Sequence, residues 1–341
     1  MGEARQGKRR EAGVTQPLRV IAIEEHFITP MYRSRVGANE FRNFYLQSRG
    51  AEMGHDIVEQ NSDLGEKRLA HMDAAGIDLQ VLSFGSPGAE AFAAEVAIPM
   101  AREANDLLSQ TKKAHPRRFE GFAALPTADP KAAAEELERC ISKLQFKGAM
   151  IHGHQQGRFL DDKRYWPIFE RAEALGVPIY LHPTLPHPDA IKAYFTGYED
   201  LARAGWGFAV DTSCHFLRLV FAGLFDAYPK LQIILGHLGE GLPFAMHRLD
   251  DHTSAAAARR GLKRKPIDYL KENMLVTTSG NWYEPAFQCT VAALGVDNIL
   301  FAVDWPYEAN TTGVEFLKKI SVSESDRAKI AHRNAEYWLK L

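Results

Sequence analysis

The side chains best suited to chemistry in this chain follow four separate apolar runs of sequence. Glu24 and His26 end the first run, His182 and His237 end two runs in the middle, and Asp304 ends the last. Glutamate, histidine and aspartate supply the oxygen and nitrogen ligands that hold a divalent metal ion. For Glu24 and His26 the alternative is a polar strand end at the rim, and a single histidine at a strand end is more often a hydrogen-bonded loop residue than a ligand. Four strand ends of this kind in one chain favour a metal site.

A second pattern joins an imidazole to a carboxylate. His237 and Glu240 lie three residues apart, where an apolar run turns into a predicted helix. A carboxylate beside an imidazole can orient the ring and raise its basicity, as a general acid/base pair requires. The alternative for Glu240 is a salt bridge, or a carboxylate favoured by the N-terminal end of the helix dipole.

Four other residues are candidates for substrate binding. Arg248, on a predicted helix, could pair with a substrate carboxylate, and a solvated helix face is the alternative. His152 follows the fourth apolar run and could line the pocket. Trp305 and Tyr307 flank the last turn and could stack on an aromatic ring, with core packing as the alternative.

The elements that position these residues are short apolar runs alternating with amphipathic segments. Predicted strands lie at residues 19–26, 78–84, 119–125, 148–153, 178–183, 232–237, 275–279 and 299–305. Predicted helices lie at residues 64–75, 89–114, 130–144, 163–175, 213–227, 242–258, 284–293, 313–320 and 324–341. Strands separated by helices pair in parallel. Eight such units in about this length favour an α/β fold of the (β/α)8 TIM-barrel type, whose working face lies at the carboxyl ends of the strands.

An open doubly wound sheet is the structural alternative, but no glycine-rich phosphate loop follows the first strand, which argues against its nucleotide-binding versions. Within a barrel, Glu24 and His26 are two residues apart and should share one face of their strand. We expect both to face the interior together with Val20 and Ala22. We expect Ile21 and Ile23 to pack beneath the helices.

Length and composition limit the domain organisation. The 341 residues suffice for one large domain, which we expect over residues 18–341, preceded by a disordered basic tail at 1–17. Residues 29–62 and 187–210 are longer than a minimal repeat needs, and we expect extra loops after strand 1 and strand 5 there. Long loops in a compact domain commonly carry function.

Charge and cysteine content exclude several classes of protein. The net charge is −2, so no basic field indicates binding to nucleic acid or to a membrane surface. No apolar run reaches the roughly 18 residues of a membrane span, and the N-terminal residues lack the apolar region of a secretory signal. Three scattered cysteines form no metal or disulfide pattern. These features predict a cytoplasmic protein.

Four motifs in this order resemble the amidohydrolase superfamily, and within it the branch of γ-resorcylate, 2,3-dihydroxybenzoate, salicylate and 5-carboxyvanillate decarboxylases. The resemblance runs from about Val20 to the end of the chain. The motifs are Glu24-Glu25-His26-Phe27, Leu181-His182-Pro183, Leu235-Gly236-His237-Leu238-Gly239-Glu240 and Asp304-Trp305-Pro306-Tyr307.

The resemblance implies one divalent metal ion held by Glu24, His26, His182 and Asp304. Hydrolytic members carry His-x-His on the first strand, and here Glu24 replaces the first histidine, which favours a single metal ion and the decarboxylase branch. His26 at the third position of this motif resembles the γ-resorcylate enzymes more than the other decarboxylases. Two carboxylates and two imidazoles suit Zn²⁺, Mn²⁺ or Mg²⁺.

The resemblance also implies roles for residues around the metal. His237 and Glu240 match the catalytic pair, and Arg248 matches an arginine that meets the substrate in the resorcylate enzyme. Phe27 joins Arg248, Trp305, Tyr307 and His152 among the predicted substrate-binding residues, although close relatives often have asparagine in place of His152. Relatives form dimers and tetramers, so we expect a homodimer or homotetramer.

The predicted activity is non-oxidative, reversible decarboxylation of an ortho-hydroxylated aromatic acid. Asp304 is the predicted proton donor to the ring carbon, and His237, supported by Glu240, shuttles the proton. Two alternatives stay open from the sequence. One is a metal-dependent hydrolase of a lactone, amide or ester, and the other is an inactive barrel kept for binding or assembly.

Overall fold

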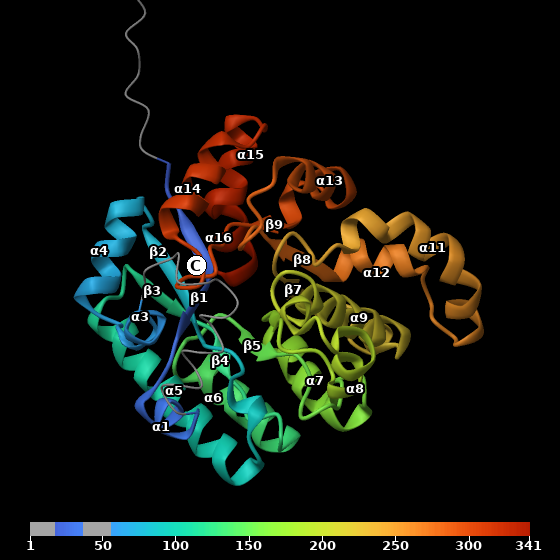
Figure 1. Ribbon diagram of the computed structural model, residues 1–341, viewed down its shortest axis with the longest axis horizontal. Coiled ribbons are helices and arrows are strands. Elements are labelled where there is room, and N and C mark those ends of the chain that lie inside the picture. The colour runs from blue at the N-terminus through green and yellow to red at the C-terminus, as the bar shows by residue number, and fades with distance from the viewer. Residues whose placement is uncertain (1–17, 37–55) are drawn as a thin grey trace, which may run out of the picture.

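The strands of the protein form a closed ring with helices around it (Figure 1). The computed structural model describes residues 18–36 and 56–341. The predicted tail at residues 1–17 and part of the predicted loop at 29–62 lie outside the described residues. No helix among the described residues is long and apolar enough to cross a membrane.

All neighbouring strands pair in parallel. The strands are β1 (Ile21–Phe27), β2 (Leu79–Phe84), β3 (Phe119–Gly121), β4 (Ala123–Ala124), β5 (Ala149–His152), β6 (Ile179–His182), β7 (Ile233–Leu235), β8 (Met274–Thr277) and β9 (Ile299–Leu300). β3 and β4 continue one another across Phe122, whose N–H donates to the carbonyl of Leu82. The nine described strands therefore make an eight-stranded ring, as the sequence predicted.

The ring closes between the segment after β9 and β1. The Asp304 N–H donates to the Glu24 carbonyl at 2.9 Å, and the His26 N–H donates to the Trp305 carbonyl at 2.8 Å. These bonds bring the last predicted strand end beside the first. The backbone itself therefore places Asp304 next to Glu24 and His26.

Helices cover the outside of the ring. The longer ones are α4 (Glu66–Ala75), α5 (Ala94–Ala114), α6 (Pro130–Ser142), α7 (Trp166–Leu175), α9 (Gly207–Phe221), α11 (Leu242–Arg259), α13 (Glu284–Leu294) and α14 (Asn310–Lys319). The short helix α10 (Leu224–Ala227) ends where the predicted helix at 213–227 ends. The predicted helix at 324–341 is divided into α15 (Glu324–Ala328) and α16 (Asn334–Leu339), with a π-helical turn at Lys329–Arg333 between them. Gly76 ends α4 in a left-handed conformation, and the Ser323 side chain caps α15 by accepting from the Asp326 N–H.

Two regions depart from the predicted elements. α12 (Pro266–Asn273) was not predicted, and α9 begins at Gly207, earlier than the predicted start at residue 213. The segment after β6 contains α8 (Pro188–Ala190), a π-helical turn and a 3-10 turn, which confirms an extra segment after the fifth strand of the ring. After β1 lie α1 (Pro30–Val36) and α3 (Ile57–Ser62).

The prediction for the two faces of β1 is wrong in part. Ile21 and Ile23 belong to the apolar cluster inside the ring, whereas Val20 and Ala22 pack in the outer cluster beneath the helices. The pairing of β1 with β2 shifts register between Ala22 and Glu25. Such a bulge inserts an extra residue, so Ile23 and Glu24 both face inward. The bulge therefore keeps Glu24 on the interior side, as predicted, whereas the apolar residues that precede it take the faces opposite to the predicted ones.

Candidate metal centre

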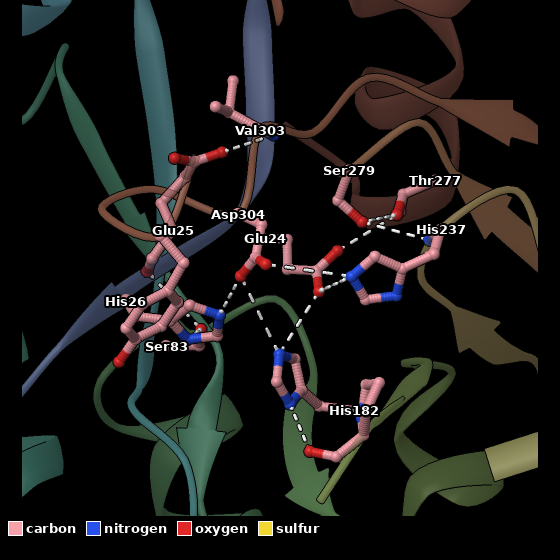
Figure 2. A network of polar contacts seen from close by, with 12 residues as sticks. Glu24, Glu25, His26, Ser83, His182, His237, Thr277, Ser279, Val303 and Asp304 are labelled. Atoms are coloured by element: carbon pink, nitrogen blue, oxygen red, sulfur yellow. Dashed lines mark hydrogen bonds and ion pairs between the residues drawn. The ribbon is translucent and has the colours of Figure 1, made fainter. Parts of the chain in front are cut away.

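Four of the ligand-type residues converge at the carboxyl ends of the strands, which confirms the predicted convergence (Figure 2). Glu24 and His26 come from β1, His182 from β6, and Asp304 from the turn after β9. One ligand atom from each lies within 4.8 Å of every other. His26 Nε2 is 3.0 Å from Asp304 Oδ1, and His182 Nε2 is 3.3 Å from Glu24 Oε1. These four residues form a single divalent-metal site.

The orientation of His182 tests whether a metal ion fits. Its Nδ1 lies 2.8 Å from the Pro183 carbonyl, an acceptor, so Nδ1 carries a proton and donates it there. In the neutral ring Nε2 is then a lone pair, and it points at Glu24 Oε1. Neither Nε2 nor Oε1 makes a hydrogen bond of normal geometry with a described residue. Two buried lone pairs that face one another need a cation between them.

The electrostatics of His182 also support a cation at this place. Burial lowers the pKa of His182, but the carboxylates of Asp304 and Glu24 outweigh burial and raise it to about 9. The negative charge that holds this proton is the charge that attracts a divalent ion. A metal ion must displace the proton from Nε2, so metal affinity should fall as the pH is lowered.

Hydroxyl groups inside the barrel fix the Glu24 carboxylate. The Tyr180 hydroxyl donates to Glu24 Oε2, and the Thr277 hydroxyl donates to the same oxygen at 3.1 Å. Thr277 and Ser279 hydroxyls lie 2.9 Å apart and continue the chain of hydrogen bonds. Because these partners all use Oε2, Oε1 is left for the metal. None of these supporting residues was predicted from the sequence.

Asp304 sits in a strained turn that points its carboxylate at three imidazoles. Its φ is +76°, in the left-handed region, and its carbonyl accepts from the N–H groups of Tyr307 at 2.8 Å and Glu308 at 3.0 Å. Burial raises the pKa of Asp304, but hydrogen bonds from His182, His237 and His26 outweigh it and hold the pKa well below its usual value. Asp304 is therefore an anion at rest.

His237 and Glu240 form the predicted pair. His237 Nδ1 lies 2.7 Å from Glu240 Oε1, and Nε2 points into the centre, 3.8 Å from Asp304 Oδ2 and 4.0 Å from Glu24 Oε1. The Ser279 hydroxyl accepts from the His237 N–H at 3.1 Å. Burial lowers the pKa of His237, but the charges of Glu240 and Glu24 outweigh it and raise the pKa well above its usual value. These charges favour the protonated form of the His237 imidazole.

Comparison with known proteins decides the family. A family model for amidohydrolases matches residues 25–341. The chain is 40% identical over 334 residues to the γ-resorcylate decarboxylase of a Polaromonas species, which covers 94% of this chain and 98% of the relative. The chain belongs to the amidohydrolase family.

Two solved structures show to which branch of the family this amidohydrolase belongs. A 2,6-dihydroxybenzoate decarboxylase in complex with 2,6-dihydroxybenzoate matches with a TM-score of 0.86 at 37% identity, covering 95% of this chain and 99% of that chain. A dihydroxybenzoic acid decarboxylase from Polaromonas, with bound manganese and the inhibitor 2-nitroresorcinol, matches with a TM-score of 0.84 at 38% identity, covering 95% and 97%. The amidohydrolase belongs to the metal-dependent aromatic decarboxylase branch.

A cavity of about 630 Å³ opens beside the metal centre of the amidohydrolase. His182, His237, Glu240, Asp304 and Tyr307 line it, whereas Glu24 and His26 lie behind them, fully buried. A small molecule in the cavity would therefore approach the site from the side of Asp304 and the two histidines. Tyr307, a predicted substrate-binding residue, lines this cavity.

Other predicted substrate-binding residues lie outside this cavity. Phe27 is buried against Phe84, with ring centroids 5.9 Å apart. The guanidinium of Arg68 stacks on the Trp305 ring, with its central carbon 4.2 Å from the ring centroid. Arg248 is exposed on α11 and does not line the cavity of its own chain. For these positions the structure does not support the predicted contact within one chain.

His152 is close to the centre but buried beneath it. Its ring centroid is 4.9 Å from that of His182, and neither ring nitrogen has a hydrogen-bond partner among the described residues. The backbone N–H of His152 donates to Glu90 Oε1 at 3.1 Å. Burial and the neighbouring His182 hold the pKa of His152 well below its usual value. The neutral ring packs against a ligand rather than lining the cavity.

Sequence analysis missed the group on the outer side of β1. Glu25 accepts from the Val303 N–H at 3.0 Å and from the Gln80 amide at 3.2 Å. Arg68, also fully buried, donates to the carbonyl of His26 at 2.5 Å. The signal available in the sequence was Glu25 itself, a charged residue in a strand buried on both faces, which requires partners.

Proposed function

We propose that this amidohydrolase is a non-oxidative decarboxylase of ortho-hydroxylated benzoic acids, and that 2,6-dihydroxybenzoate is the first substrate to test. The observation that carries the proposal is the four-ligand cluster that opens, through Asp304 and His182, into a cavity beside the His237–Glu240 pair. The support from relatives is the likeness to a decarboxylase with 2,6-dihydroxybenzoate bound.

The metal ion is proposed to be Mn²⁺, because a similar structure holds manganese, with Zn²⁺ and Mg²⁺ as the other candidates for this donor set. Held by Glu24, His26, His182 and Asp304, it would supply positive charge to the substrate carboxylate and the neighbouring phenol oxygen. All other steps fall to the side chains of the protein.

Positioning is the first role of the chain. The substrate carboxylate can reach the centre only past His182, His237 and Asp304, because the remaining ligands are buried behind them. Tyr307, whose ring is 5.5 Å from His26, bounds the same end of the cavity. A ring held between these groups has its carboxyl-bearing carbon next to Asp304, which shortens the search for the reactive geometry.

Proton delivery is the second role. The carboxylates around His237 raise its pKa, and the imidazoles around Asp304 lower its pKa, so the proton is favoured on His237 rather than on Asp304. We assign the transfer from His237 Nε2 to Asp304 Oδ2, now 3.8 Å away, and from Asp304 to the ring carbon. The carbon–hydrogen bond forms, the bond to the carboxylate breaks, and its electron pair restores the aromatic ring as CO₂ leaves. Glu240 stabilises the imidazolium before the transfer.

The test is a panel of hydroxybenzoates incubated with Mn²⁺-reconstituted protein, with CO₂ release and aromatic product both measured. The proposal predicts equal amounts of CO₂ and resorcinol from 2,6-dihydroxybenzoate, and no reaction with 3- or 4-hydroxybenzoate, which lack the ortho oxygen. Acid release from lactones or esters, without CO₂ from any hydroxybenzoate, would contradict it. The predicted homodimer or homotetramer is to be measured on the same protein by light scattering.

A further inference from the structure

A buried carboxyl group and a buried imidazole face each other behind the metal ligands. Glu90, in the 3-10 turn that follows β2, is 3% exposed, and His152, at the end of β5, is 2% exposed. Glu90 Oε1 accepts from the His152 backbone N–H at 3.1 Å, and Glu90 Oε2 lies 3.8 Å from His152 Nδ1. Neither side chain lines the cavity beside the metal centre. The proton transfer proposed above therefore does not use this pair.

Gly88 brings the backbone of the segment between β2 and α5 directly onto the pair. Its φ is +70°, in the left-handed region that favours glycine. A Cβ atom at this position would clash with Glu90 Oε2 and would lie 2.6 Å from His152 Nδ1, closer than non-bonded atoms approach. Any side chain at position 88 must therefore displace Glu90 or His152.

The dry surroundings decide how the two groups match. Burial raises the pKa of Glu90 to about 8, although its hydrogen bonds with backbone N–H groups partly offset this. A neutral carboxylic acid carries one O–H donor, and a neutral imidazole has one nitrogen lone pair. An acid proton on Oε2 would face the lone pair of His152 Nδ1, and a shift of about 1 Å would join the two in a hydrogen bond. A carboxylate would instead place lone pairs against one another.

The imidazole of this pair packs against a metal ligand. His152 and His182 are register partners on the adjacent strands β5 and β6, so their side chains share the inner face. Their ring centroids are 4.9 Å apart, with the planes inclined by 60°. The Pro183 carbonyl fixes one edge of the His182 ring through Nδ1, and the His152 ring limits its tilt from the side. Contacts therefore run from Gly88 through Glu90 and His152 to a metal ligand.

We infer that Glu90 and His152 are positioning residues for the metal ligand His182, and that Gly88 allows the segment after β2 to hold them in place. Residues that orient metal ligands commonly contribute 10–100-fold to metal affinity. The inference concerns the metal centre and holds for any substrate. Metal binding therefore tests it separately from CO₂ release, and metal binding as predicted without CO₂ would overturn the proposed function alone.

Two glycine variants separate displacement of the pair from backbone strain. Gly88→Ala should weaken Mn²⁺ binding by about tenfold or more, because the added methyl group displaces Glu90 or His152. Gly76 has a φ of +81°, and a Cβ atom there would meet no atom within 4 Å. Gly76→Ala should therefore lose stability through its backbone but bind Mn²⁺ as the wild type does.

The measurement is titration of metal-depleted full-length protein with Mn²⁺, with free Mn²⁺ followed by electron paramagnetic resonance (EPR). Urea midpoints of the same samples report stability. Equal Mn²⁺ affinity in the two folded variants would overturn the role of Gly88.

Variants of Glu90 keep the test independent of the folding of Gly88→Ala. Glu90→Gln retains an acceptor for the His152 N–H, and its NH₂ group can donate to Nδ1 as the acid does, so it should bind Mn²⁺ like the wild type. Glu90→Leu keeps an apolar side chain of similar size but no acceptor, and its Mn²⁺ affinity should fall by about tenfold or more. Equal affinities in the two variants, whether high or low, would contradict a neutral hydrogen-bonding role for Glu90.

The EPR spectrum of bound Mn²⁺ reports the geometry of the ligands directly. His152→Ala removes the ring beside His182 and should change the zero-field splitting of the bound ion at saturating Mn²⁺. His154 lies two residues further along and packs against Phe159 and His187, so His154→Ala should leave the spectrum unchanged. Wild-type spectra from both variants would show that His152 does not position the metal ligand.

Discussion

Glu24 and Glu25 are neighbours on β1 and both are fully buried, but they face different surroundings. On the inner side, Glu24 keeps one oxygen without a normal hydrogen bond, 3.3 Å from an imidazole nitrogen. On the outer side, both oxygens of Glu25 accept hydrogen bonds, from the Val303 N–H and the Gln80 amide. Burial is common to the two. An uncommitted lone pair facing other ligands is particular to the inner carboxylate.

The pKa values of the two carboxylates are shifted in opposite directions. Burial raises the pKa of Glu24, but the imidazoles of His237 and His182 outweigh it, so the pKa is lowered. Burial raises the pKa of Glu25 well above its usual value, and the nearby Arg68 only offsets part of this. A cluster of histidines therefore keeps the inner carboxylate ionised and able to bind a cation. The outer carboxylate serves as a structural hydrogen-bond acceptor.

The residues on the outer side of β1 nevertheless contribute to the metal site. Arg68 donates to the His26 carbonyl at 2.5 Å and to the Asp63 carbonyl at 2.8 Å, and its guanidinium stacks on Trp305. It thereby ties β1 to the segment that carries Asp304. The inner side of β1 supplies metal ligands, and the outer side fixes the backbone from which those ligands project.

The largest effect is expected on the inner side, in Asp304→Asn. Loss of the proposed proton donor and of a ligand should lower the rate of CO₂ release by about 10³-fold or more. Asparagine tolerates the left-handed conformation that Asp304 adopts, so the melting temperature should stay close to that of the wild type. Activity within about tenfold of wild type would remove Asp304 from both roles.

A matched pair tests the two carboxylates directly. Glu24→Gln should lower bound metal to under about a tenth of an equivalent, because the neutral amide no longer balances a cation. Glu25→Gln should keep its metal ion and lose about 1–3 kcal/mol of stability, because an amide NH₂ replaces an acceptor of the Gln80 hydrogen bond. Metal analysis and denaturant unfolding measure the two quantities. Equal metal loss in both variants would contradict the division of roles.

A smaller effect is expected when the charge beside His237 is removed. In Glu240→Gln the imidazolium loses its partner at 2.7 Å, so the pKa of His237 should fall and activity should drop by about 10–100-fold. The limb of the pH–rate profile that reports deprotonation of His237 should move to lower pH. A profile that keeps its shape and position, whatever the drop in rate, would show that Glu240 does not act through His237.

The smallest effect concerns a buried histidine without carboxylate partners. His215 lies on α9, and its Nε2 accepts from the Leu160 N–H at 2.9 Å. Burial lowers the pKa of His215 to about 3, whereas His182 beside the carboxylates is raised to about 9.

Below the unfolded value of about 6.5, the unfolded chain binds a proton that native His215 does not, so stability falls as the pH drops from about 6.5 towards 3. His215→Gln should lose part of this acid sensitivity. Urea midpoints at pH 7.5 and pH 4.5 measure it. An unchanged difference between the two midpoints would mean that His215 does not contribute.

The sequence predicted the ligands because their signal is local. An apolar run that ends in a ligand-type residue marks a strand end, and parallel pairing brings all such ends to one side of the ring. The bulge in β1 has no such signal. Strands of a parallel barrel are apolar on both faces, so the alternation of Ile21, Ala22 and Ile23 does not reveal which side is the interior.

Phe27 and Trp305 lie outside the cavity for a common reason. Phe27 follows His26, and Trp305 follows Asp304, and successive side chains of an extended segment point to opposite sides. A residue directly after an inward-facing ligand should therefore face outward, as both do. Arg248 lies about two turns into α11, where the helix has left the cavity. α12 was missed because residues 260–273 are mostly polar and show no clear helical periodicity.

The central claim is that Glu24, His26, His182 and Asp304 hold one divalent ion. Its most direct test is a crystal grown with Mn²⁺, with anomalous diffraction data collected at the manganese absorption edge. The account predicts one strong peak per chain at bonding distance from Glu24 Oε1, His182 Nε2 and the facing atoms of the other two residues. A peak held by other residues, or none at these four under saturating Mn²⁺, would contradict it.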